Sequence, residues 1–419
     1  MSSPTKSGAS DSDNPLHSLP PSVSNEISRF LSRIRRQQVT SPQDMARKTL
    51  EIMRAMIASL KKTPKSQGDI TVQALILMIK RAGCVLMAAV PHELVIGNMV
   101  RRVLAIVREE AAAAGKAASS GAAASGIGGG NEDDESESEG SDASDNSYDD
   151  EGGAFKEATS AGPSLLKLLD APEASEIFSK PAKMIKNVIL EGINELIDEL
   201  SSVSAHIAEQ AIEHIHANEV ILTAGRDATV EAFLKAAHKK RTFEVIVAET
   251  AGRGGAEGHL TATALAEAGI SVTLIADAAV FAMMARVNKV IVGAHAVMAN
   301  GGLIATAGCH MLALAALHSS VPLVACAGLY KLTPLFPAGP DEYNVLLSPQ
   351  PMVAYEEGLQ GVHVPNPAYD YVPPELVALH ITNIGANHAS YVYRLLAEYY
   401  HEEDHDLSVE APACGKKSP

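Results

Sequence analysis

Five residues near the end of the chain, 401–405, spell the pattern HExxH. On a helix, this pattern places two zinc ligands and a general base on one face. Here it lies in acid-rich sequence that runs into a polar tail, where we expect no dry cavity. We therefore interpret the pattern as a chance match in a solvated segment and predict no zinc site.

A glycine-rich loop at residues 252–258 could also carry chemistry. It precedes an expected helix, so its backbone amides could cradle a phosphate. Its spacing matches neither the dinucleotide-binding pattern GxGxxG nor the P-loop pattern GxxxxGK[ST]. We interpret it as a flexible connection between a strand and a helix.

Four histidines could in principle act as metal ligands. His214 and His216 are two residues apart at an expected helix end, so they do not share a helix face. This spacing favours a cap or a partner contact over a metal site. We interpret His295 and His310 as core or loop residues, and we predict neither a metal nor a cofactor for this chain.

Tyrosine is concentrated toward the C-terminus. Nine of the ten tyrosines follow residue 329, and the densest set is Tyr369, Tyr371, Tyr391, Tyr393, Tyr399 and Tyr400. Tyrosine is enriched at interfaces because it combines apolar area with a polar tip. A tyrosine-rich core would give the same pattern, so the sequence leaves both interpretations open.

The first half of the chain has the apolar spacing of helices. Apolar residues three and four apart predict helices from about Val23, Met45, Val72 and Val95, and one long helix over 178–216. We predict a disordered tail at 1–21 and a helical domain at 22–217. Residues 111–162 are rich in Ala, Gly, Ser and acid, which predicts a disordered insertion within that domain.

The pattern changes at Glu219. Short apolar runs near 220–222, 243–248, 270–276, 290–292 and 321–326 alternate with helical stretches of about ten residues. Such alternation is typical of βαβ units and predicts an α/β fold with a doubly wound, Rossmann-like parallel sheet over 218–405. We predict a tail at residues 406–419. Ligands of such sheets bind beyond the carboxyl ends of the strands, so the loops to inspect begin at Thr223, Glu249, Asp277 and Gly293.

Charge restricts the partners that we expect. The chain has 419 residues and a formal net charge of -16. Eleven Asp or Glu residues lie between 131 and 151, so the rest of the chain carries -5 (-16 + 11). An acidic balance argues against nucleic acid as the main partner, because phosphate binding needs a basic surface.

One long uncharged stretch could suggest a membrane span. Residues 290–330 contain no Lys, Arg, Asp or Glu. Polar residues and Pro322 interrupt the run, whereas buried parallel strands also read as continuous apolar sequence. We therefore predict a core location and no membrane partner. The four cysteines form no CxxC pair and the N-terminus has no signal-peptide pattern, so we expect reduced thiols in a cytoplasmic protein.

The chain resembles the family shared by methylthioribose-1-phosphate isomerase, ribose-1,5-bisphosphate isomerase and the alpha, beta and delta subunits of eukaryotic translation initiation factor 2B. Within this family it is most similar to the beta subunits. The resemblance runs from about residue 23 to 405, outside the acidic insertion. It is carried by 97–104 (GNMVRRVL), 213–221 (EHIHANEVI), 229–235 (TVEAFLK), 287–293 (VNKVIVG), 371–376 (YVPPEL) and 390–395 (SYVYRL).

The resemblance implies that the isomerase site has degenerated. The isomerases use a cysteine and an aspartate for proton transfer, and Gly225 stands where the cysteine falls, whereas Asp277 matches the aspartate. Ala251 replaces their phosphate-binding arginine, and Arg253 reaches that position only in a shifted alignment. Their second sugar-contacting motif is degraded at 300–302. One half of an acid–base pair cannot run the reaction, so we predict a non-catalytic protein.

The resemblance also implies partners. A beta subunit of this kind pairs with a delta subunit through the Rossmann-like domains, inside a complex that also holds alpha, gamma and epsilon subunits. That complex exchanges guanine nucleotide on translation initiation factor 2, and its regulatory subunits contact the factor's alpha subunit and sense its phosphorylation. The candidate contact residues here are Asn187, Glu191, Glu195, His216, Tyr369 and Tyr371.

Two alternatives stay open. The chain could be an active sugar-phosphate isomerase, although the missing cysteine at Gly225 counts against this. It could also bind a sugar phosphate or nucleotide without turnover, although the missing arginine at Ala251 counts against that.

Overall fold

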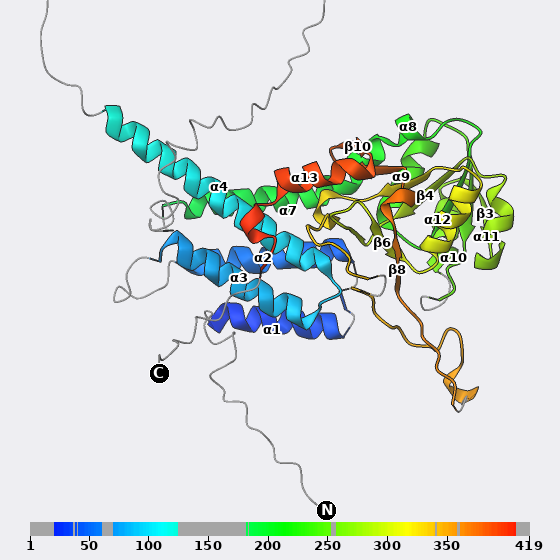
Figure 1. The fold of residues 1–419 in the computed structure, drawn as a ribbon, viewed down its shortest axis with the longest axis horizontal. Coiled ribbons are helices and arrows are strands. Elements are labelled where there is room, and N and C mark those ends of the chain that lie inside the picture. Colours follow the sequence, from blue (N-terminus) through cyan, green and yellow to red (C-terminus); the bar gives the residue numbers. More distant parts are fainter. Residues whose placement is uncertain are drawn as a thin grey trace, which may run out of the picture.

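The computed structural model describes residues 21–407 apart from 37, 40, 61–69, 125–181, 183, 253–256, 340, 341 and 358–360. An N-terminal set of helices is followed by an α/β unit, and the two lie side by side (Figure 1). This order confirms the predicted fold class. The N-terminal helices are α1 (Pro21–Arg35), α2 (Pro42–Ser59), α3 (Val72–Ala89), α4 (Leu94–Ala124), α7 (Lys186–Glu209) and α8 (Ala211–His214).

Local sequence explains where these helices begin. Proline occupies the first position of α2, where its missing N–H leaves no hydrogen bond unmade. The Thr71 hydroxyl accepts a hydrogen bond from the Ala74 amide at 3.3 Å and so caps α3. Helix α3 is long and apolar enough to cross a membrane by composition, but its residues Leu75 and Ile79 are fully buried in the core.

Two predicted boundaries in the helical part were wrong. Helix α4 continues to Ala124, whereas we predicted a disordered insertion from residue 111. Alanine has the highest helix propensity, so the Ala-rich segment extends the helix. The single helix predicted over 178–216 is two helices, α7 and α8, which meet at Gln210. The acidic part of the insertion lies outside the described residues.

The α/β unit is built on a seven-stranded sheet in the order β10-β9-β7-β4-β1-β2-β3. All neighbouring pairs are parallel except β9 and β10. Without β10, the strands lie in the Rossmann order β3-β2-β1-β4-β7-β9. From β1 the chain first adds strands on one side and then, from β4 onward, on the other side. The strands are β1 (Val220–Ala224), β2 (Glu244–Ala248), β3 (Ser271–Ile275), β4 (Lys289–Gly293), β7 (Leu323–Cys326), β9 (Leu379–Thr382) and β10 (Gly385–Asn387).

Helices lie between these strands or follow them along the chain. The fold also contains a small second sheet that we did not predict. The helices are α9 (Ala228–His238), α10 (Glu257–Glu267), α11 (Val280–Met284), α12 (Cys309–His318) and α13 (Val392–Tyr399). The second sheet is antiparallel, with β6 (Leu303–Thr306) between β5 (Ala296–Val297) and β8 (Tyr369–Val372). Strands of two to four residues are too short for periodicity to identify.

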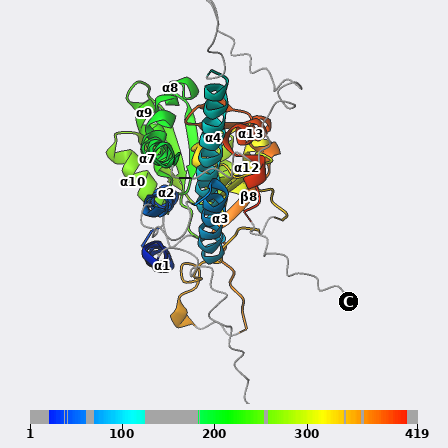
Figure 2. The ribbon, with the colours of Figure 1, turned by 90° about the vertical axis from the view of Figure 1, so that its left-hand side faces the viewer.

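Most of the uncharged stretch 290–330 is buried, which confirms the prediction of a core location, but Met311, Leu314 and Leu317 are exposed. It divides into β4, β5, β6, α12 and β7, and all four residues of β7 are buried. Side chains of the main strands alternate between two cores. Ile221 and Val245 pack in the core of the N-terminal helices and α9, whereas Leu222 and Ile246 pack with α11, α12 and α13. The N-terminal helices therefore share one apolar core with a face of the sheet and with α9. Helix α7 lies beside α9 (Figure 2).

Candidate functional site

A cleft of about 390 Å³ lies where the strand order reverses. Its walls come from the loops that follow β1 and β4, from the start of α2, and from the short helix η5 (Leu329–Lys331). A Rossmann-type sheet places ligands at this point because the loops after β1 and β4 diverge to opposite faces. The cleft is therefore the first place to look for chemistry.

The structure brings together Gly225, Ala251 and Asp277, which the sequence assigned to one degenerate site. Thr250 links them, because its hydroxyl accepts a hydrogen bond from the Gly225 amide at 2.9 Å and its own amide donates to Asp277 Oδ1 at 2.9 Å. The Ala251 amide donates to Asp277 Oδ2 at 3.1 Å. Both oxygens of this carboxylate thus accept backbone N–H groups. They hold the turn after β2 against the end of β3.

The backbone at Gly225 explains why a glycine occupies the position. Its φ is +72°, in the left-handed region that disfavours side chains. A Cβ atom built there would lie 3.0 Å from the Thr306 hydroxyl oxygen. A cysteine at this position would strain the backbone and would lie close to Thr306.

The cleft also contains an ion pair that the sequence analysis did not single out. Lys331 Nζ lies 3.0 Å from Asp227 Oδ2, and their side chains are 4% and 20% exposed. Asp227 Oδ1 also accepts the Thr229 amide at 2.7 Å and so caps α9. A Cβ at Gly293 would lie 2.4 Å from Asp227 Oδ2, so only glycine allows this close approach.

Electrostatics keep both partners of this pair charged. Burial raises the pKa of Asp227, but the ammonium of Lys331 and the Thr229 amide outweigh burial and hold the pKa below its usual value. Burial lowers the pKa of Lys331, and Asp227 more than compensates, so that pKa is raised. The most buried cation of the cleft is therefore neutralised by a residue of the same chain.

A buried thiol lies near the site but cannot replace the missing cysteine. Cys309 is 1% exposed at the start of α12. Burial, followed by the nearby charges of Asp370 and Asp277, raises its pKa to about 12. A thiol with this pKa stays protonated at neutral pH and is a poor base or nucleophile.

Comparison with known proteins decides the family. Residues 38–389 match the model of the initiation factor 2 subunit family. The chain is 46% identical over 380 residues to translation initiation factor eIF2B subunit beta of Dictyostelium discoideum, covering 90% of this chain and 95% of that protein. The chain belongs to the initiation factor 2 subunit family. Its match to a beta subunit extends over nearly the full length of both proteins.

Two further comparisons show what kinds of protein this chain is similar to. A chain of the tetrameric eIF2B-beta2-delta2 complex from Chaetomium thermophilum matches with a TM-score of 0.59 at 26% identity, over 92% of this chain and 97% of that chain. Ribose 1,5-bisphosphate isomerase of Archaeoglobus fulgidus is 35% identical over 213 residues, which are 50% of this chain and 67% of the enzyme. The relatives of this chain thus include both an enzyme and an initiation-factor subunit.

In the glycine-rich loop, close packing requires glycine at position 258. A Cβ at Gly258 would lie 2.2 Å from the carbonyl oxygen of Ala248, so α10 can approach the end of β2 only with glycine here. Residues 253–256, including Arg253, lie outside the described residues. Among the residues that are described, no group of three His, Cys, Asp or Glu side chains is placed to hold a metal ion.

The candidate contact residues of the helical part lie on one exposed stripe. Asn187, Glu191 and Glu195 are exposed and recur every four residues along α7, so they share a face. Asn194 beside them accepts a hydrogen bond from Arg54 of α2 at 3.1 Å. His216 is exposed at the end of the helical part, where its Nδ1 lies 2.8 Å from Arg241 Nη1.

The two candidate tyrosines have different environments. Tyr369 is 5% exposed and stacks on His295 with a centroid distance of 4.2 Å, so it is a core residue. Its assignment as a partner contact is therefore corrected. Tyr371 is half-buried and its hydroxyl accepts a hydrogen bond from Asn300 at 2.7 Å. Tyr400 is also buried, at 3% exposure.

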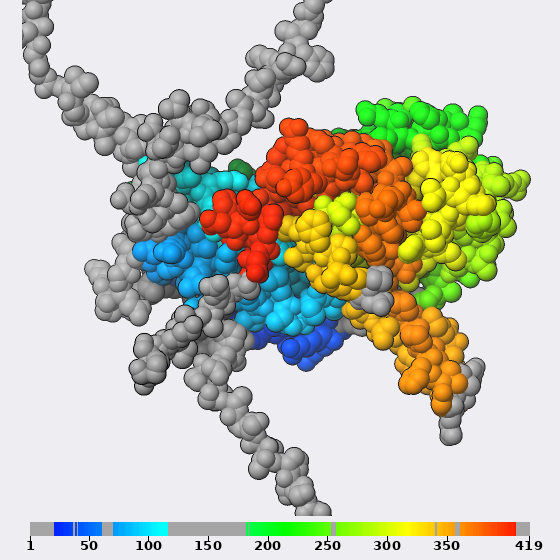
Figure 3. Space-filling model, viewed as in Figure 1, coloured from blue at the N-terminus to red at the C-terminus, as the bar shows by residue number. Residues whose placement is uncertain are grey.

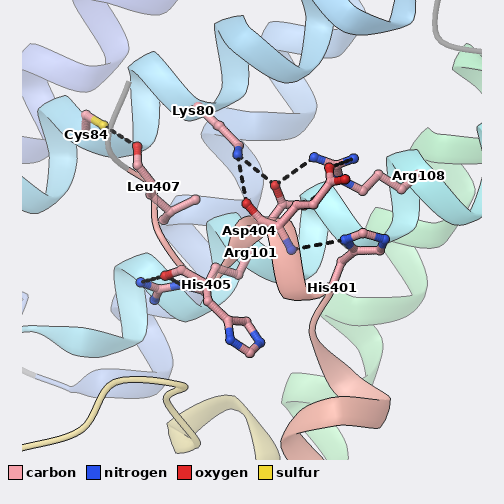
Figure 4. Close-up of polar contacts among 9 residues, drawn as sticks. Lys80, Cys84, Arg101, Arg108, His401, Asp404, His405 and Leu407 are labelled. Atoms are coloured by element: carbon pink, nitrogen blue, oxygen red, sulfur yellow. Dashed lines mark hydrogen bonds and ion pairs between the residues drawn. The ribbon is translucent and has the colours of Figure 1, made fainter. Parts of the chain in front are cut away.

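The HExxH segment is only partly solvated, since residues 401–403 are exposed, as we expected, but Asp404 is buried. Residues 401–407 form what we call the C-terminal clamp, which lies against α3 and α4 (Figure 4). Asp404 is fully buried, and Leu407, beyond the predicted end of the domain at 405, is 2% exposed in the core. The short helix η9 (Glu402–Asp404) is capped by His401, whose ring nitrogen accepts the Glu403 amide at 3.3 Å.

Charge fixes the clamp in place. Arg108 donates to both oxygens of Asp404, at 2.7 and 3.0 Å, and Lys80 Nζ lies 2.9 Å from Asp404 Oδ1. Burial raises the pKa of Asp404, but the hydrogen bonds from Arg108 and Lys80 outweigh it and the pKa is lowered. Arg101 donates to the His405 carbonyl at 3.1 and 3.2 Å. The segment is therefore attached to the helices by Asp404, which occupies an x position of the pattern, and by the backbone carbonyl of His405.

Sequence reasoning missed Lys331, Asp227 and the clamp. Lys331 had a signal, because it is the first charged residue after the uncharged stretch 290–330. Asp227 had another, since Asp before a helical pattern is a typical N-cap. No feature of the sequence indicated the clamp, because nothing distinguishes Asp404 from the other acidic residues near it.

Proposed function

We propose that this chain is a non-catalytic regulatory subunit of the guanine-nucleotide exchange factor for translation initiation factor 2, acting in the cytoplasm. In this proposal it pairs with a delta subunit within a complex that also holds alpha, gamma and epsilon subunits. The exposed stripe of α7 contacts the alpha subunit of the substrate factor and helps to sense its phosphorylation. The proposal is supported by the similarity of the chain to eIF2B beta subunits.

One observation carries the non-catalytic part of the proposal. The polar groups at the strand ends bond to the protein itself, since Asp277 accepts two backbone amides and Lys331 is paired with Asp227. Gly225 supplies no thiol, and a Cβ atom there would lie 3.0 Å from the Thr306 hydroxyl oxygen. An aldose-to-ketose reaction needs an acid and a base that both reach the substrate, and the site offers no such pair.

The partner part is supported by assembly and by surface chemistry. A chain of similar fold occurs in a complex named for beta and delta subunits. The stripe of α7 carries two carboxylates and an amide, which suit a polar or basic protein surface.

The contact stripe can be tested by charge reversal. Glu195→Lys should weaken binding of the substrate factor's alpha subunit about tenfold or more, because a like charge would replace a complementary one. Glu209→Lys is the matched control, since Glu209 is also exposed on α7 but lies about 21 Å farther along the helix. Binding can be measured by biolayer interferometry. Equal affinities for wild type and Glu195→Lys would remove the stripe from the proposal.

The cleft itself favours a second candidate, a phosphosugar or nucleotide sensor. Arg226 lines the cleft with its side chain 54% exposed, so one cation there remains open to solvent. A ligand that binds only the folded state raises the unfolding temperature by mass action. A thermal-shift screen with ribose-1,5-bisphosphate and nucleotides tests this candidate, and a shift that Arg226→Ala abolishes would support it.

A further inference from the structure

Another cleft, of about 540 Å³, lies between the helices α3 and α4 and the C-terminal clamp, and we call it the α3–α4 cleft. Residues 334–336, in the loop after η5, complete its wall. Figure 3 shows these segments at one face of the molecule, where the red clamp lies beside light-blue α3 and the golden loop. The α3–α4 cleft shares no lining residue with the cleft at the strand ends, so the two are separate sites.

Arg101 of α4 lines the α3–α4 cleft as a buried cation. It is 4% exposed, and its Nε and Nη2 groups donate to the His405 carbonyl at 3.2 and 3.1 Å. Its Nη1 atom lies beside Gly97, where a Cβ atom would approach it to 3.0 Å. Within the described part of the chain no carboxylate forms an ion pair with Arg101, whereas Arg108 is paired with Asp404.

The positive charge of Arg101 is therefore only partly compensated. Burial lowers its pKa, and Tyr400, Tyr343, Asp406 and Asp404 raise the pKa by less. An arginine side chain nevertheless stays charged at neutral pH. Because a buried charge without an ionic partner is unfavourable, an anion that reaches this guanidinium stabilises it. The α3–α4 cleft gives an anion that access.

The other walls of the α3–α4 cleft indicate which kind of anion fits. Most of them are apolar and include Met87, Leu335, Phe336 and Leu407, so they suit a ligand with an apolar body. Asp406 is exposed and also lines the cleft. Its negative charge repels a doubly charged phosphate more strongly than a carboxylate with a single charge. The walls therefore favour a monocarboxylate over a phosphate ester.

His405 offers a second polar contact for such a ligand. Its Nε2 atom is buried and has no hydrogen-bond partner among the residues that the structure describes. Burial, followed by the charge of Arg101, lowers the pKa of His405, so its ring is neutral at neutral pH. A neutral imidazole carries one N–H group, which can donate to an anion. A carboxylate beside Arg101 would satisfy both groups.

We propose that the α3–α4 cleft binds a small monocarboxylate with an aliphatic body, whose carboxylate pairs with Arg101 and whose body lies against Met87 and Phe336. Three lining residues, 405–407, belong to the C-terminal clamp, so a bound ligand would also hold the clamp against the helices. The inference goes beyond the proposed function and does not depend on it, because it uses neither the strand-end cleft nor the stripe of α7.

Calorimetric titration of the full-length chain with octanoate tests the inference, and octanol serves as the matched uncharged probe. Octanoate should bind saturably, and octanol should bind about tenfold or more weakly, because it lacks the charge that pairs with Arg101. Octanoate should also raise the unfolding temperature, since it binds the folded state. Equal binding of both probes, or no binding of octanoate up to about 5 mM, would overturn the inference.

Two variants locate the site. Phe336→Asp places a negative charge on an apolar wall and should raise the dissociation constant of octanoate about tenfold or more. Phe281→Asp is the matched control, because Phe281 is 60% exposed, close to the 63% of Phe336, but lies on α11 outside the cleft. It should leave the dissociation constant unchanged. If the two variants bind octanoate equally well, the ligand does not occupy the α3–α4 cleft and the inference is wrong.

The role of the charge is tested at Arg101 itself. Arg101→Gln keeps an N–H donor but removes the charge, so it should abolish the preference for octanoate over octanol. Its unfolding temperature is measured in parallel, because the side chain is buried. A folded Arg101→Gln variant that still prefers octanoate would contradict the inference, and Phe336→Asp decides the question if Arg101→Gln does not fold.

Discussion

The strand-end cleft and the C-terminal clamp both contain a carboxylate paired with cations of the same chain. In the cleft, Asp227 is 20% exposed and has one cationic partner, Lys331. In the clamp, Asp404 is fully buried and has two, Arg108 and Lys80. One pair lies where enzymes of the family would bind substrate, and the other joins the C-terminal segment to the helices.

The two carboxylates differ in burial and in their number of cationic partners. The cleft keeps the geometry of a ligand site but directs its polar groups toward the protein. The clamp overlaps the HExxH pattern, but its ion pairs are made by Asp404, which is not one of the three residues that define the pattern. The role of a charged residue in a cleft or a motif can therefore be assigned only when its partners are known. Substitutions can measure how strongly each carboxylate depends on its cations.

The largest effect is expected at Asp404. Asp404→Asn leaves Arg108 and Lys80 without their shared buried partner, which should lower the free energy of unfolding by about 3 kcal/mol. Glu403→Gln is the control, because Glu403 also contacts Arg108 but is 67% exposed, and it should cost less than about 1 kcal/mol. Chemical denaturation followed by circular dichroism measures both. Equal losses would mean that burial of Asp404 is not what makes the clamp strong.

A smaller loss is expected in the cleft. Lys331→Met removes the partner of Asp227 and should lower the free energy of unfolding by about 2 kcal/mol, because a largely buried charge is left uncompensated. The double variant Asp227→Asn, Lys331→Met should recover most of that loss, since asparagine still caps α9. The same denaturation experiment gives the coupling energy. A double variant as unstable as the sum of the single changes would contradict direct pairing.

Stability at acid pH depends on both carboxylates. Each has a lowered pKa in the folded protein, so its stabilisation is fully present above the unfolded pKa of about 3.9 and is lost as the pH falls through the lower, folded value. Asp404→Asn removes one of these two titrating groups. The free energy of unfolding should therefore fall less steeply with decreasing pH in Asp404→Asn than in wild type. Parallel curves in an acid titration would show that Asp404 does not titrate in this range.

The smallest effect is expected at Gly225. Gly225→Cys restores the residue type of the isomerases at a φ of +72° and should cost about 1 to 2 kcal/mol of stability. We expect no isomerase activity, because Asp277 and Lys331 stay bound to the protein. Gly339→Ala, with open space around its Cβ, is a stability control. Turnover by Gly225→Cys would mean that the thiol alone separates this chain from the enzymes.

The parts of the fold that could be predicted from sequence are those encoded locally. Alternating strands and helices placed Gly225, Ala251 and Asp277 at the ends of neighbouring strands, and the structure joins them through Thr250. The pairs that could not be predicted connect distant residues. Lys331 and Asp227 are 104 residues apart, and Arg108 and Asp404 are 296 apart. Periodicity contains no information about such contacts, and Tyr369 was misplaced for the same reason.

We propose that this member of the initiation factor 2 subunit family has no isomerase activity. The most direct measurement is to incubate the purified chain with ribose-1,5-bisphosphate and follow the ketose product by phosphorus NMR, with the Archaeoglobus fulgidus isomerase as positive control. We expect conversion no faster than in the sample without protein. Conversion that scales with protein concentration and disappears in Asp277→Asn would contradict the claim.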